Sequence, residues 1–77
     1  MADNPGSELE GRYANSFEVG FNAYEFVIDF AQQYEPASGR KHTRIITSPA
    51  LARGLTDLLE DSLRKFEAMY GEPGLVK

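Results

Sequence analysis

The sequence has 77 residues, no cysteine, one histidine and a formal net charge of −4. A chain of this length is expected to form one domain that buries about 60% of its unfolded surface. The absence of cysteine excludes disulfides and thiolate metal sites, and a single histidine excludes a histidine cluster. The acidic balance argues against a general polyanion-binding protein.

The ends of the sequence differ in composition from its middle. Residues 1–11 lack the basic and then apolar order of a secretory signal, so we expect a disordered polar tail there. Residues 12–71 are expected to form a single domain, and residues 72–77 a C-terminal tail without assigned structure. No apolar run approaches the roughly 20 residues that span a membrane. Together with the missing disulfides, this favours a cytoplasmic protein.

Two segments alternate between apolar and polar residues, as half-buried strands do. The first is Tyr13–Phe21 and the second is Glu25–Gln33. Asn22 offers a short turn between them because asparagine tolerates left-handed backbone, so we expect a hairpin. A helix competes with the second strand, since Phe26 and Phe30 also have helical spacing, but the Phe-Val-Ile run favours a strand.

The next two elements are a loop and a third strand. Glu35–Lys41 combines proline, glycine and charged residues, which predicts a long loop. His42–Thr47 is the predicted third strand. Its residues Ile45 and Ile46 point to opposite faces, which suggests apolar cover on part of both sides.

The last third of the sequence predicts a long helix, Ala50–Tyr70. Ser48 can cap the first free N–H groups, Pro49 suits the first helical position, and Gly71 suits the end. The expected fold is therefore α+β: a three-stranded, mostly antiparallel sheet in the order β-β-β-α, covered on one face by this helix.

The apolar residues of the helix cover more of its surface than one sheet face requires. We expect Leu55, Leu59, Phe66 and Tyr70 to lie on the sheet and a second copy of the chain to cover the remainder. The expected homodimer interface consists of Leu51, Leu55, Leu58 and Met69. The alternative is a monomer whose helix has exposed leucines, which is common.

Residues 40–44 form a basic cluster that is a candidate for phosphate or RNA contacts. The possible phosphate contacts are Arg40, Lys41, Arg44 and Arg53. Basic residues on an edge strand more often prevent unwanted strand pairing, and this reading is preferred. Nucleic acid is accordingly an unfavoured partner.

Other candidates for chemistry are weaker. Asp29 with Glu18 or Glu25 could form a carboxylate pair for acid/base or metal chemistry, but carboxylates on the wet face of a hairpin are the ordinary reading, and Asp29 could meet Arg44 across the strands. His42 lacks a companion for general-base work, and Ser48 is interpreted as a cap.

The remaining features give no cofactor site. The aromatic residues could line a pocket for a planar ligand, but their spacing suits a core beneath a helix. The glycines have no phosphate-loop spacing. We therefore assign no catalytic residue, metal ligand or cofactor.

Several motifs resemble a family of small prokaryotic domains of unknown function. They are Tyr13-Ala14-Asn15, Glu25-Phe26-Val27-Ile28-Asp29-Phe30, Arg44-Ile45-Ile46-Thr47-Ser48-Pro49, Lys65-Phe66-Glu67 and Tyr70-Gly71. The resemblance covers Tyr13 to Gly71 and implies relatedness without an activity or site residues. A polar turn with proline would be typical where this sequence has Phe21-Asn22-Ala23-Tyr24.

These observations predict a non-enzymatic homodimer that acts as a protein-interaction or scaffold module. It would use the helix for self-association and the sheet edge or the acidic hairpin face for another protein. The alternative is a nucleic-acid-associated regulator that uses the basic cluster. A small hydrolase is disfavoured because no nucleophile, base and orienting group occur together.

Overall fold

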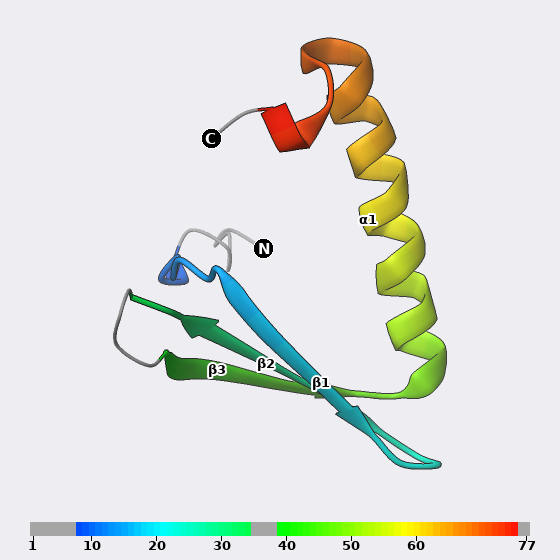
Figure 1. The fold of residues 1–77 in the computed structure, drawn as a ribbon. Coiled ribbons are helices and arrows are strands. Elements are labelled where there is room, and N and C mark those ends of the chain that lie inside the picture. The colour runs from blue at the N-terminus through cyan, green and yellow to red at the C-terminus, as the bar shows by residue number, and fades with distance from the viewer. Residues whose placement is uncertain (1–7, 35–38, 76–77) are drawn as a thin grey trace. The chain divides into compact units, whose positions relative to one another are not determined.

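The computed structural model describes residues 8–34 and 39–75, and Figure 1 shows their elements in chain order. Three strands precede one long helix and a short 3₁₀ turn, which confirms the predicted α+β class. The chain divides into two units, residues 1–19 with 28–45 and residues 20–27 with 46–77, and each is described by itself. The predicted disorder of the N-terminal tail falls largely on residues outside those described.

The sheet is antiparallel, and its strands lie in the order β1-β2-β3, so β2 is central (Figure 1). The strands are β1 (Ser16–Phe21), β2 (Phe26–Gln32) and β3 (Arg40–Thr47). The prediction placed the start of β1 too early, at Tyr13, and the start of β3 too late, at His42. Arg40 and Lys41 therefore belong to a strand and not to the predicted loop, whose residues 35–38 lie outside those described.

Asn15 extends the pairing of β1 with β2 beyond the end of the strand. Its N–H donates to the Ala31 carbonyl at 3.0 Å. Its side-chain amide then acts like a further backbone unit, donating to the Gln33 carbonyl at 3.2 Å and accepting from the Gln33 N–H at 2.7 Å. These two hydrogen bonds to Gln33 give the Tyr-Ala-Asn motif a physical role, because they fix the register of the first two strands.

The hairpin turn closes through the side chain of Asn22 and not through left-handed backbone. Its Oδ1 accepts from the Tyr24 and Glu25 N–H groups at 2.7 and 2.9 Å, and its own N–H donates to the Glu25 carbonyl at 3.0 Å. Among the described residues other than glycine, none has a positive φ. The expected left-handed asparagine is therefore wrong, because an Asx-type turn satisfies the same backbone groups.

Helix α1 (Pro49–Tyr70) begins and ends where the sequence predicts, to within one residue. The Ser48 hydroxyl accepts from the Leu51 N–H at 3.1 Å, which is the predicted cap. Gly71 has φ 89° and ψ −172°, a region open almost only to glycine, and its N–H donates to the Glu67 carbonyl at 2.9 Å. A 3₁₀ turn, η2 (Pro73–Leu75), follows where no structure was assigned.

Burial is scarce in this chain. Among the residues whose burial is described, only Ala31 and Asp29 are buried, both on the central strand β2. No residue of α1 is buried, so the core role expected for Leu55, Leu59, Phe66 and Tyr70 is not observed. The prediction that this helix covers one face of the sheet stays a prediction.

Aromatic pairs bridge β1 and β2 at two places. In the first unit, the rings of Phe17 and Phe30 meet edge to face, with centroids 5.6 Å apart. In the second, the rings of Phe21 and Phe26 stack with centroids 5.4 Å apart. Such cross-strand pairs stabilise a hairpin by about 0.2–1 kcal/mol each. Phe17 and Phe21 nevertheless remain exposed, so these rings do not form the core expected from their spacing.

Candidate functional site

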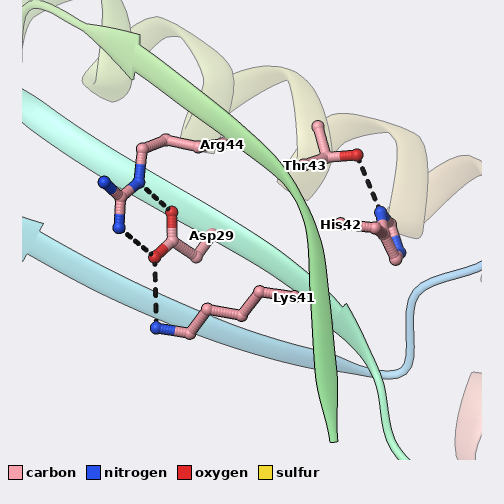
Figure 2. A pocket seen from close by; sticks show the side chains of 5 residues that line it. All are labelled: Asp29, Lys41, His42, Thr43 and Arg44. Carbon is pink, nitrogen blue, oxygen red and sulfur yellow. Dashed lines mark hydrogen bonds and ion pairs between the residues drawn. The ribbon is translucent and has the colours of Figure 1, made fainter.

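The most developed polar site is centred on Asp29, in the middle of the central strand. Asp29 is only 6% exposed, and its carboxylate receives a bidentate contact from Arg44 on β3. The Arg44 Nε donates to Oδ1 at 2.7 Å and Nη2 donates to Oδ2 at 2.9 Å (Figure 2). The cross-strand pairing of Asp29 with Arg44 considered from the sequence is therefore present. A fork of this kind holds both partners in one orientation.

Lys41 links this pair to the neighbouring strand β1. Its Nζ lies 3.3 Å from Asp29 Oδ2 and 2.6 Å from Glu18 Oε1. Two carboxylates and two basic side chains, one from β1, one from β2 and two from β3, thus form a neutral group, the Asp29 cluster (Glu18, Asp29, Lys41 and Arg44). Within the described chain, every buried side-chain polar atom has a hydrogen-bond partner.

The partners of Asp29 change its proton affinity. The hydrogen bond from Arg44 lowers the pKa of Asp29 most, burial opposes this, and Lys41 lowers it further, to about 2. The same contacts raise the pKa of Lys41, through Glu18 first and Asp29 second, and Asp29 raises the pKa of Arg44. Asp29, Lys41 and Arg44 are therefore charged at neutral pH.

This arrangement is poorly suited to acid/base chemistry. A general base needs a pKa near the working pH and a free lone pair, whereas Asp29 has a low pKa and its oxygens accept from two cations. Asp29 and Glu18 do share a sheet region, as one candidate pair required, but Lys41 lies between them. Within the described residues, no group of three potential metal ligands forms.

The regular alternation of β3 is interrupted within this site. Strict alternation would send Lys41 and Arg44 to opposite faces, yet both reach Asp29. Figure 2 shows His42 and Thr43 together on the other side of the strand from Asp29. Because His42 and Thr43 are successive residues on one side, the side chains of β3 do not alternate strictly there.

Both ring nitrogens of His42 have partners. Nε2 lies 2.9 Å from the Tyr13 carbonyl, and Nδ1 lies 2.7 Å from Thr43 Oγ1. A carbonyl only accepts, so Nε2 carries a proton and, in the neutral ring, Nδ1 accepts from the threonine hydroxyl. The histidine ties β3 to the segment before β1.

The three predicted phosphate contacts on β3 do not form one site. Lys41 and Arg44 belong to the Asp29 cluster, where each meets a carboxylate. Arg40 instead lines a separate hollow with Arg12. Arg53 lies on α1, in the other unit. The sequence indicated the contact of Arg44 with Asp29 but not the contacts of Lys41 with Asp29 and Glu18.

The predicted interface residues share one side of α1. At about 100° per residue, Leu51, Leu55, Leu58 and Met69 fall within about 60° of arc. We call them the apolar side of α1, and their exposed fractions are 67%, 42%, 67% and 74%. Neighbouring Leu59, Leu63 and Tyr70 are also exposed. Within the part of the chain that the structure describes, no helix combines the length and apolar character that crossing a bilayer requires.

The fold and these two surfaces define a small α+β protein with a neutral ionic cluster on its sheet and an exposed apolar helix. Residues 3–72 match the model of a family described as a protein of unknown function, DUF3467. The match covers most of the chain, so the protein belongs to this family, as the motifs of the sequence indicated. No curated protein and no solved structure matches the chain.

Proposed function

We propose that this protein is a non-enzymatic interaction module of the cytoplasm that works as a homodimer, with the apolar side of α1 as its self-association surface. The observation that carries the proposal is the exposure of this side of the helix, together with the absence of any buried residue on α1. A helix this long with an exposed apolar stripe is typical of a surface that binds another helix.

A second copy of the chain suits this surface for two reasons. The helix carries three basic residues (Arg53, Arg64, Lys65) and four acidic ones (Asp57, Glu60, Asp61, Glu67), so two identical helices repel each other little. The apolar positions also suit an antiparallel pair, because Leu51 stands near one end of the helix and Met69 near the other. Each Leu51 would then contact the partner's Met69 across a two-fold axis.

Burial of the apolar side would stabilise such a dimer. A leucine or methionine side chain moved fully from water into an apolar contact contributes about 1.5–3 kcal/mol. The same contact would relieve the scarcity of buried residues in the single chain, which small domains without disulfides often solve by association. The edge strand β3 is the proposed surface for another protein, because one side of its backbone has no neighbouring strand.

The nucleic-acid alternative receives less support. Phosphate contacts need guanidinium or ammonium groups that are available to the ligand. Lys41 and Arg44 already contact carboxylates, with distances of 2.6 and 2.7 Å. A titration with DNA or RNA at two salt concentrations separates the two functions, since the regulator requires binding that weakens steeply with salt.

Cysteine cross-linking tests the proposed dimer directly, because the natural chain has no cysteine that could interfere. We expect that a mixture of the Leu51→Cys and Met69→Cys variants forms a disulfide-linked heterodimer on mild oxidation. Each variant alone should cross-link poorly, since the two-fold axis holds identical ends apart. Efficient cross-linking of Leu51→Cys with itself would indicate a parallel pair, and sedimentation as a monomer at micromolar concentration would refute the proposal.

A further inference from the structure

The hollow that Arg40 lines with Arg12 lies on the first unit, where the segment before β1, the end of β2 and the start of β3 meet. It is lined by Arg12, Tyr13, Gln32, Tyr34, Arg40 and His42. Its volume of about 270 Å³ is just below the range of roughly 300–1,000 Å³ that is usual for small-molecule sites. The hollow therefore suits a small ligand better than an extended one.

Two arginines give this hollow a positive character. Within residues 8–34 and 39–75, no carboxylate lies within ion-pair distance of Arg40, in contrast to Lys41 and Arg44. Arg12 contacts Glu10 at 3.0 Å, but both side chains are more than half exposed, so this pair is weak and easily exchanged for a stronger anion. A planar guanidinium binds phosphate oxygens in a bidentate manner.

Two tyrosines give the same hollow aromatic walls. Tyr13 and Tyr34 are 69% and 55% exposed, so a ligand can reach both side chains. The Tyr34 hydroxyl donates to Gln32 Oε1 at 3.0 Å, and the Tyr13 carbonyl accepts from His42 at 2.9 Å. These contacts fix the tip of one side chain and the backbone of the other. Stacking on such rings is the usual way in which proteins hold a flat base.

We propose that this hollow binds a phosphate monoester carried by a flat ring system, of which a nucleoside monophosphate is the simplest example. The base would stack on Tyr13 or Tyr34, and the phosphate would meet Arg40 and Arg12. The net charge of −4 repels a long polyanion, but it acts less on one terminal phosphate that faces two guanidinium groups. The inference does not depend on the proposed dimer, because none of the lining residues belongs to α1.

The test is a titration of the full chain with adenosine monophosphate, followed by amide NMR spectra. Adenosine and inorganic phosphate serve as separate probes. We expect the shifts to concentrate at residues 12–13, 32–34 and 40–42, and the monophosphate to bind more tightly than either probe. Loss of the guanidinium in Arg40→Gln, or of the ring in Tyr34→Leu, should weaken binding by roughly tenfold.

Arg53→Gln is the matched control, since it removes the same charge from a residue that does not line the hollow. It should change the affinity less than twofold, and circular dichroism confirms that all three variants fold. Equal weakening by Arg40→Gln and Arg53→Gln would overturn the proposal in favour of unspecific charge attraction. Binding of the monophosphate no tighter than that of inorganic phosphate, or affinity for RNA that rises with strand length, would overturn it as well.

Discussion

The Asp29 cluster and the apolar side of α1 both hold side chains in unfavourable surroundings. The first holds a charge that is buried, and the second holds apolar side chains that are exposed to water. Asp29 is a charged residue that is 6% exposed, and the neighbouring strand β3 supplies two cations to its carboxylate. Leu51 and Leu58 are apolar residues that are each 67% exposed. The buried charge of Asp29 has partners of opposite charge within the chain, whereas Leu51 and Leu58 remain exposed to water.

This difference indicates where the chain is complete by itself. A buried carboxylate without partners would be too costly to persist, so its cations have to be local. A single exposed apolar side chain destabilises the folded state far less than an unpaired buried charge does, so it can remain exposed in the free chain. The charge of Asp29 is thus compensated within the sheet, whereas the exposed leucines of α1 are the residues that the proposed dimer would cover.

The largest expected effect is on the dissociation constant of the proposed dimer and tests the role given to the apolar side of α1. Leu58→Asp would place a charge in the proposed apolar contact, which is unfavourable in the dimer but harmless in a monomer. We expect the dissociation constant to rise by about 100-fold or more, and Leu51→Asp to act similarly. Analytical ultracentrifugation over a dilution series measures this change.

Glu60→Ala is the control for both aspartate variants. Glu60 lies on the opposite side of α1 from Leu51 and Leu58, so its loss should leave the dissociation constant nearly unchanged. Should all three variants sediment like the natural protein, the assignment of the association surface is wrong.

A smaller effect concerns the end of the helix, whose stability rests on local geometry because α1 has no buried residue. Gly71 adopts φ 89° and ψ −172°, a conformation that costs other residues about 1–3 kcal/mol. Gly71→Ala should therefore lower the free energy of unfolding by about that amount in chemical denaturation.

Gly54→Ala provides a matched comparison with the opposite sign. Gly54 lies inside α1, where an added Cβ would meet nothing within 4 Å. Alanine is favoured over glycine in a helix interior by about 0.5–1 kcal/mol, so this variant should be more stable than the natural protein. A loss of stability at both positions would contradict the local origin of the effect.

The start of the helix should show a still smaller loss. Ser48→Ala removes the hydroxyl that accepts from the Leu51 N–H and should cost about 1 kcal/mol. Ser48→Gly should cost only a few tenths of a kcal/mol, since glycine leaves room for water at the same N–H. Equal effects of the two changes in urea denaturation would show that this cap contributes little.

The sequence predicted the elements well because their signals are local. Ser48, Pro49 and Gly71 mark the helix ends by their own chemistry, and alternation marked the strands of the hairpin. The strand ends were less accurate, because the pairing of Asn15 with Gln33 replaces regular strand by a side-chain contact.

The candidate site was only half predictable for a different reason. The pairing of Asp29 with Arg44 was within reach, since charged residues on neighbouring strands often meet. The addition of Lys41 was not, because it depends on the interrupted alternation of β3, which no local residue pattern announces. Arg40 is separated from Lys41 for an ordinary reason, because successive residues of a strand point to opposite faces.

The last prediction concerns the pH dependence of stability and tests how much the ion pairs of Asp29 contribute to the sheet. The pKa of Asp29 is lowered from 3.8 to about 2, chiefly by the hydrogen bond from Arg44. A carboxyl group with a lowered pKa stabilises the folded state above its unfolded pKa and loses this contribution as the pH falls through the folded pKa. At neutral pH the contribution is complete, so no change is expected between about pH 5 and 8.

Asp29→Asn isolates this contribution, because it keeps the size of the side chain and removes its charge. The difference in unfolding free energy between the natural protein and this variant should be constant above about pH 5 and shrink as the pH falls from about 5 towards 2. Urea denaturation at a series of pH values measures it. A difference that stays constant down to pH 2 would mean that the ion pairs of Asp29 do not hold the sheet together, and the contrast with the helix would then disappear.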